Sequence, residues 1–279
     1  MISPKLHRFR FRDLLLYDLA GLTASLILAF LLIDTSLVYL AVLPYPLLLL
    51  LLIRRRLTKL GITPAEFLGV RPRPDIAWGE LTVVSVFTFL AYFSIRQIFA
   101  LFAGIEAQPL AKVYGPFSGE LPLLLSVFFL LIPVITIFFE LHRVVLLVRL
   151  SRRWNVAAAA LIVAALTALI GHSEGWVFSF FIYSVVMSLM YTRYETILAP
   201  IVSGCITGVI AIILIAWAKQ NNIEIYSLSF IAQYRWLFIA GAVVSLVPVL
   251  WFIRRAWPPA DWGKETGGGE EEAGIARGP

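Results

Sequence analysis

The residues best suited to chemistry lie inside an almost wholly apolar run at positions 121–150. Glu140 is the first charged residue of this run, and Arg143 follows three positions later. Placing either charge in hydrocarbon costs about 2.5–3.5 kcal/mol or more, so such residues usually face other protein or a wet cavity. In a helix the two lie about 60° apart on one face. Two interpretations remain open: a self-neutralising pair, or a carboxylate that Arg143 holds ionised so that it can activate water as a general base.

Other polar residues of the apolar spans add fewer possibilities. His142 is turned by roughly 200° from Glu140 and should be an interfacial or hydrogen-bonded histidine. Positions 171–175 read Gly-His-Ser-Glu-Gly, which is either a turn or a proton-transfer or metal-ligand His172 backed by Glu174. The chain has 3 histidines and no paired spacing such as HExxH, so we expect no metal and no cofactor. Arg96 should form an ion pair with Glu174.

The composition indicates which elements position these residues. Of 279 residues, 60% are hydrophobic and 14% are charged, and the mean hydropathy is +0.89, unlike a soluble domain. About eight segments approach the roughly 20 apolar residues that cross a bilayer. They are 14–33, 36–53, 81–103, 121–148, 156–176, 177–192, 196–218 and 235–253. Because backbone groups in lipid must be satisfied internally and no alternating strand pattern is present, we expect an all-α polytopic membrane protein.

Basic residues mark one side of the membrane at every second loop. They precede the first span and follow spans two, four, six and eight. Span two is followed by Arg54, Arg55, Arg56 and Lys59, span four by Arg149, Arg152 and Arg153, span six by Arg193, and span eight by Arg254 and Arg255. The positive-inside rule then places both termini in the cytoplasm, with the protein in the cell membrane. The net charge of +6 therefore reflects topology in the bilayer, and we expect no nucleic-acid partner.

The chain divides into a membrane domain at 1–257 and a tail at 258–279. The tail is rich in Pro, Gly and Glu and cannot bury a core, so it should be disordered and cytoplasmic. The first span contains Asp18 and has no clear small-residue cleavage site, which predicts an uncleaved anchor. The single cysteine, Cys205, excludes an internal disulfide and should fill space in an apolar span.

The helix around Glu140 resembles a known family signature. Its run FFELHRVVLLVRL, at 138–150, resembles the first motif of the CPBP family, EExxxR with a GVLLxRL-like tail. Ala168–His172 occupies the second motif, FxxxH. Residues 187–191 and 198–204 occupy the approach to the third, HxxxN or HxxxD, and 57–74 looks like the family's loop before the core. The resemblance covers roughly 54–218. It implies the bundle fold of CAAX prenyl endopeptidases and of bacteriocin-processing or abortive-infection membrane proteins.

The family's catalytic set is incomplete in this sequence. Aligned on Arg143, the family's paired glutamates fall on Phe138 and Phe139, and Glu140 matches only if one residue is deleted. Arg143 and His172 transfer directly. A rise of about 1.5 Å per helical residue places Glu140 roughly 14 Å from the cytoplasmic end of its span. The same count places His172 roughly 24 Å from the cytoplasmic start of the next span. The two should therefore lie at different depths.

The last motif has lost its polar residues. Gly204 and Gly208 stand where the resemblance places His and Asn. Small residues four apart let helices approach closely, so the pair either contacts a partner or ligand or fills the space between helices. We predict a catalytically degenerate CPBP-like protein that binds a membrane-protein partner or a lipidic ligand. The alternative is an active intramembrane endopeptidase that uses Glu140 and His172; a transporter is less favoured, since inverted repeats are not evident.

Overall fold

The computed structural model describes residues 11–32, 44–63, 76–104, 121–151, 153–170 and 177–258. Within these ranges the regular elements are nine helices, and no strand occurs, which confirms the all-α class for this part of the chain. The helices are α1 (Phe11–Leu32), α2 (Pro44–Leu60), α4 (Trp78–Ala103), α6 (Leu121–Ser151), α7 (Val156–Ile170), α8 (Val177–Tyr194), α9 (Leu198–Gln220), α10 (Leu228–Gln233) and α11 (Arg235–Ala256).

Length and composition of the helices indicate a membrane protein. Among the described residues, 4 helices are long and apolar enough to cross a bilayer: α4, α8, the Leu198–Ala218 part of α9, and α11. Shorter apolar stretches occupy α1 and α7. The outer surface is apolar as well, with Phe30 77% and Leu237 67% exposed. Many large apolar side chains are exposed in this way, which suits lipid better than water.

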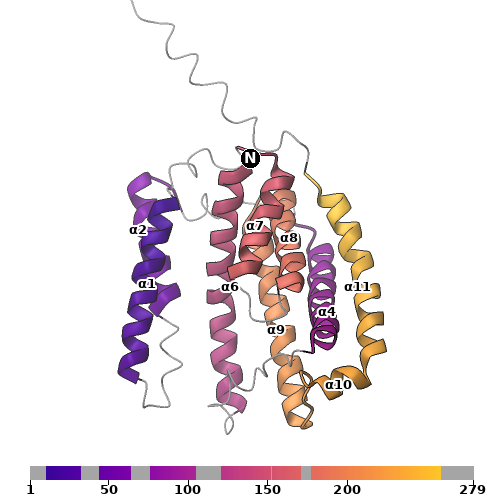
Figure 1. Cartoon of the computed structure of the whole chain (residues 1–279). Coiled ribbons are helices and arrows are strands. Elements are labelled where there is room, and N and C mark those ends of the chain that lie inside the picture. Colours follow the sequence, from indigo (N-terminus) through magenta and orange to yellow (C-terminus); the bar gives the residue numbers. More distant parts are fainter. Residues whose placement is uncertain are drawn as a thin grey trace, which may run out of the picture.

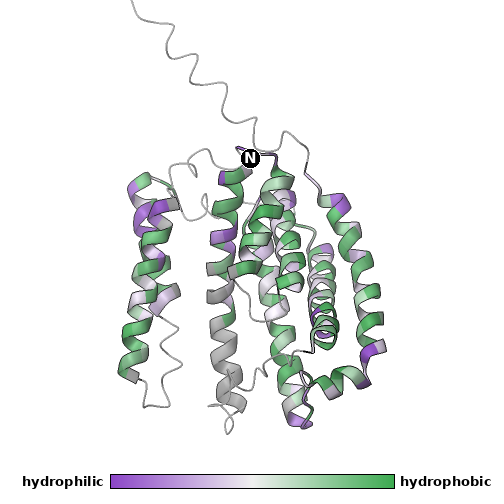
Figure 2. Cartoon of the chain, in the orientation of Figure 1, coloured by the Kyte–Doolittle hydropathy of each residue, from purple (hydrophilic) through white to green (hydrophobic). Residues whose placement is uncertain are grey.

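The helices form a bundle in which α6 lies between the α1–α2 pair and the other helices (Figure 1). On its far side α4 packs against α8, α9 and α11. The carboxyl ends of α2, α6, α8 and α11 lie together at the upper end of Figure 1. Basic residues stand in the last turn of each of these helices, namely Lys59, Arg149, Arg193, and Arg254 with Arg255. The bundle therefore has one strongly basic end, and its flanks are largely hydrophobic (Figure 2).

Two large apolar clusters join the helices, beside a small one at Ala100, Ile231 and Phe238. One brings Leu57 of α2 against Leu147 of α6 and Val163 of α7. The other brings Leu81 of α4 against Met187 of α8 and Phe252 of α11, as part of a larger buried set. In lipid, close van der Waals packing of this kind is a main source of helix association, because lipid tails are as apolar as the side chains.

Two elements differ from the expectation. The second span was expected to end at residue 53, but α2 continues to Leu60. The helix continues through the basic residues because two residues of this turn contact the rest of the bundle. Leu57 is buried, at 3% exposed, and Arg56 forms an ion pair with Asp13 of α1 at 3.1 Å. The expected loop before the last span contains α10. Ser227 caps this helix by accepting a hydrogen bond from the Phe230 amide at 3.3 Å.

Candidate functional site

Glu140 and Arg143 form an ion pair in the interior of the bundle. They stand one turn apart on α6, and Arg143 Nη1 donates to Glu140 Oε1. Their exposed fractions are 1% and 3%. The sequence spacing correctly placed the two on one helix face. Because both charges are removed from solvent, each depends on the other for compensation.

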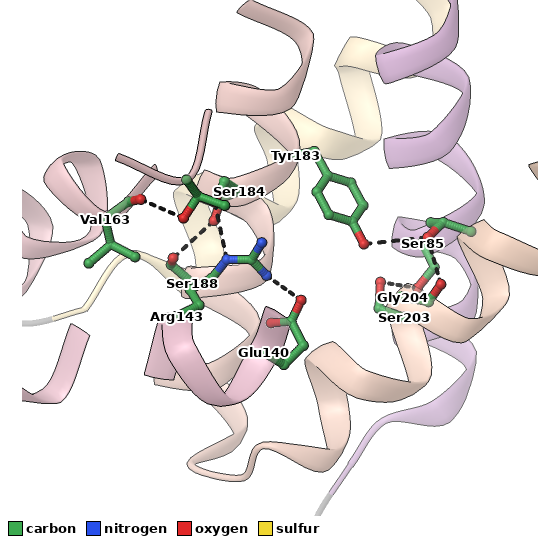
Figure 3. Close-up of polar contacts among 11 residues, drawn as sticks. Ser85, Glu140, Arg143, Val163, Tyr183, Ser184, Ser188, Ser203 and Gly204 are labelled. Carbon is green, nitrogen blue, oxygen red and sulfur yellow. Dashed lines mark hydrogen bonds and ion pairs between the residues drawn. The ribbon is translucent and has the colours of Figure 1, made fainter. Parts of the chain in front are cut away.

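A second helix fixes the guanidinium. Arg143 Nε donates to Ser184 Oγ of α8 at 3.1 Å, and the guanidinium carbon lies 5.8 Å from the centre of the Tyr183 ring. Figure 3 shows Arg143 between Glu140 on α6 and Ser184 on α8. Ser188, one turn further along α8, donates to the Ser184 carbonyl at 2.9 Å. Of the two serines of α8, Ser184 thus binds the guanidinium directly, and Ser188 binds the α8 backbone.

Only one of the two carboxylate oxygens of Glu140 has a hydrogen-bond partner among the described residues. Oε1 accepts the hydrogen bond from Arg143, whereas Oε2 is buried and has no hydrogen-bond partner among the described residues. A buried acceptor left unsatisfied costs about 1–3 kcal/mol, and more when it is charged. A polar group of this kind in a native protein calls for a water or a ligand that supplies the missing donor.

The pair borders a cavity of about 230 Å³ between α4, α6, α8 and α9. Its walls are mainly apolar and aromatic, and they are contributed by, among others, Phe89, Phe139, Phe180, Tyr183, Gly208 and Ala211. Glu140 and Arg143 supply its charged groups. Sites for small molecules typically combine such apolar walls with a few placed polar groups. This cavity is smaller than the roughly 300–1,000 Å³ common for drug-sized ligands, so it suits one narrow apolar chain.

The two glycines of α9 face α6 of the same chain. A Cβ atom built on Gly204 would collide with the Thr136 side chain, and one on Gly208 would lie 2.9 Å from Ile132 Cγ2. Their shared role is therefore a close approach of α9 to α6, and both also border the cavity. Of the residues singled out in the sequence, the structure brings Glu140, Arg143, Gly204 and Gly208 together at this one place.

Some cavity residues carry no sequence signal. Tyr183 lies in an apolar helix, and its hydroxyl contacts Thr207 Oγ1 at 3.4 Å. Thr207 in turn donates to the Gly204 carbonyl at 2.9 Å (Figure 3 shows Tyr183 directed toward α9). The one usable signal is the spacing of Ser184 and Ser188, which places two hydroxyls on one face of an apolar span.

His142 lies apart from the cavity, as its helical phase predicts. Its Nε2 atom lies 2.8 Å from Asp18 Oδ2 of α1. Tyr45 of α2 donates its hydroxyl proton to Asp18 Oδ1 at 3.2 Å. The three side chains thereby join α1 and α2 to α6, so His142 helps to hold these helices together.

The remaining candidates are only partly covered by the structure. His172 and Glu174 lie outside the described residues, so the expected Arg96–Glu174 pair stays a prediction. Arg96 is 3% exposed, and its guanidinium carbon lies 4.5 Å from the centre of the Tyr226 ring, a cation–π contact. No group of three His, Cys, Asp or Glu that could hold a metal occurs in the part of the chain that the structure describes.

Comparisons with known proteins add no relative. The chain matches no protein-family model, no curated protein and no solved structure.

Proposed function

We propose that this protein is an eight-span membrane protein of CPBP-like fold that no longer hydrolyses peptides, and that its cavity binds a lipidic ligand. The resemblance places a glutamate at the position of Phe139, and the Phe139 ring instead lines the cavity. Glu140 is neutralised by Arg143. An aromatic wall with an internally compensated charge favours holding an apolar chain over activating water.

The observation that carries this proposal is the pairing of apolar walls with one unsatisfied oxygen. The cavity offers hydrocarbon contacts on several sides, and Glu140 Oε2 lacks a donor among the described residues. A lipid with a hydroxyl or an amide N–H near its chain would satisfy both features. The small volume argues for such a chain over a helix from a partner protein.

Filling the cavity should remove the ligand. Ala211→Phe places a ring in the space that Ala211 borders. We therefore expect the purified variant to carry much less co-purified lipid than the wild type, as measured by mass spectrometry of lipid extracts. Ile213→Phe is the matched control, because Ile213 is 58% exposed on the same helix. Equal lipid content in wild type, Ala211→Phe and Ile213→Phe would refute the proposal.

A second candidate is peptide hydrolysis at the same place. The unpartnered Oε2 atom favours it, because a carboxylate oxygen in a cavity can accept a proton from water. This function would require His172 to approach Glu140, against the difference in depth expected from the sequence. It would also require Glu140 to act while bound to Arg143.

We also propose that the basic end of the bundle faces the cytoplasm. The last turns of α2, α6, α8 and α11 all carry Lys or Arg at this end, and cytoplasmic loops are enriched in these residues. On this proposal a reporter fused after residue 225, beyond α9, reports the outer side, whereas a cytoplasmic signal there would reverse the orientation.

A further inference from the structure

A second hollow, which we call the α4–α11 groove, shares no lining residue with the Glu140 cavity. It measures about 470 Å³ and is bordered by Gly79, Val83 and Val84 of α4 and by Val247, Pro248 and Trp251 of α11. The space beside Gly79 is open, since a Cβ atom built there would meet nothing within 4 Å. The groove therefore offers an almost wholly apolar channel on the outer face of the bundle.

Two arginines that form no ion pair with another described residue stand at the end of this groove. Arg254 and Arg255 are exposed in the last turn of α11, and the Arg255 guanidinium carbon lies 5.2 Å from the ring centre of Trp251, a groove residue. Among the described residues the groove is bordered by a single acid, Glu80, which is already paired with Arg193 at 3.1 Å. Its charge is therefore compensated, and the end of the groove is positive.

Tryptophans place this end at the membrane surface. Trp78, Trp251 and Trp257 are 52%, 50% and 49% exposed, and they lie at the first turn of α4 or at the end of α11. Exposed tryptophans gather where lipid headgroups meet the hydrocarbon. The arginines consequently stand at headgroup level, and the valines of the groove lie deeper.

We propose that the α4–α11 groove binds an anionic phospholipid, with an acyl chain along Val83, Val84 and Val247 and the phosphate at Arg254 and Arg255. Arginine matches phosphate through paired N–H donors, and each basic residue near a membrane surface adds attraction for anionic lipid. Any lipid could fill the apolar channel, but only an anionic headgroup gains from the charged end. This site is independent of the proposed function of the Glu140 cavity.

Lipid titration of the purified, delipidated full chain tests this site. Native mass spectrometry would count the adducts formed with phosphatidylglycerol and with phosphatidylcholine of identical chains. Arg254→Gln with Arg255→Gln should lower the preference for phosphatidylglycerol by roughly tenfold to thirtyfold. The matched control, Arg54→Gln with Arg55→Gln, removes the same charge from two exposed residues of α2 and should leave the preference unchanged. Gly79→Leu, which extends into the open groove, should reduce binding of both lipids.

Each alternative gives a different result. Equal losses in the two arginine pairs would mean general attraction to a basic surface, and no loss in either would mean that Arg254 and Arg255 only cap the carbonyls of α11. Unaltered lipid binding by Gly79→Leu would mean that the acyl chain does not lie in the α4–α11 groove. Displacement of phosphatidylglycerol by inorganic phosphate would show an anion site without a lipid. Any of these outcomes overturns the proposal.

Discussion

Arg143→Leu is expected to destabilise the protein by about 3–5 kcal/mol or to prevent its accumulation in the membrane, because it leaves a buried charge without compensation. Glu140 is 1% exposed, and Arg143 is the hydrogen-bond donor that the structure gives it. The substitution also releases the Ser184 hydroxyl from the guanidinium. The midpoint of unfolding in detergent, together with the amount of protein in membranes, would measure the loss.

The double variant Glu140→Leu with Arg143→Leu separates pairing from simple packing. Replacing both charges by apolar side chains removes the need for compensation, so stability should partly return. Arg149→Leu is the control, since Arg149 is exposed in the last turn of the same helix. Equal damage in the single and double variants would show that Glu140 and Arg143 do not act as a pair.

Gly204→Ala should cost about 1–3 kcal/mol of stability, the range typical of overpacking. The new methyl group would collide with the Thr136 side chain, and a β-branched residue in a helix has little freedom to rotate away. Thr136→Ser removes the methyl group of Thr136 and should restore most of the loss. Thermal or detergent unfolding of the three variants gives the comparison.

Gly79→Ala is the matched control for this prediction. Gly79 also lies in a helix, but a Cβ atom there meets nothing within 4 Å. We expect unchanged stability or a gain of up to about 1 kcal/mol from the better helix propensity of alanine. Unchanged stability in Gly204→Ala would mean that α9 and α6 do not pack as closely as the structure has them.

Most helices were predictable from the sequence because a segment that crosses a bilayer must be long, apolar and helical. Each of the segments that hydropathy selected overlaps a helix. Hydropathy missed the end of α2 and the whole of α10, because both depend on contacts: Arg56 needs Asp13 of another helix, and α10 is a 6-residue element. Such short pieces carry too few residues for a periodic pattern.

The candidate site was predictable only within one helix. The i,i+3 spacing places Glu140 beside Arg143, but the other contacts of the site join distant parts of the chain. Ser184 lies 41 positions from Arg143, and the collision partner of Gly204 is on α6. Asp18 and His142, 124 positions apart, illustrate the same limit. Local periodicity assigns a side chain to a face, and packing alone decides which helix that face meets.

The most direct test of the central claim, that the cavity holds a ligand and does not perform hydrolysis, compares purified wild type with Glu140→Gln. Both preparations would be assayed for bound lipid by mass spectrometry and for cleavage of hydrophobic and prenylated peptides. Our account predicts no cleavage by either protein. It also predicts bound lipid in both, because the apolar walls are unchanged, but less in Glu140→Gln, because the amide nitrogen that replaces Oε2 cannot accept a hydrogen bond from the ligand. Peptide cleavage by wild type that falls about a hundredfold or more in Glu140→Gln, the effect typical of losing a general base, would contradict it.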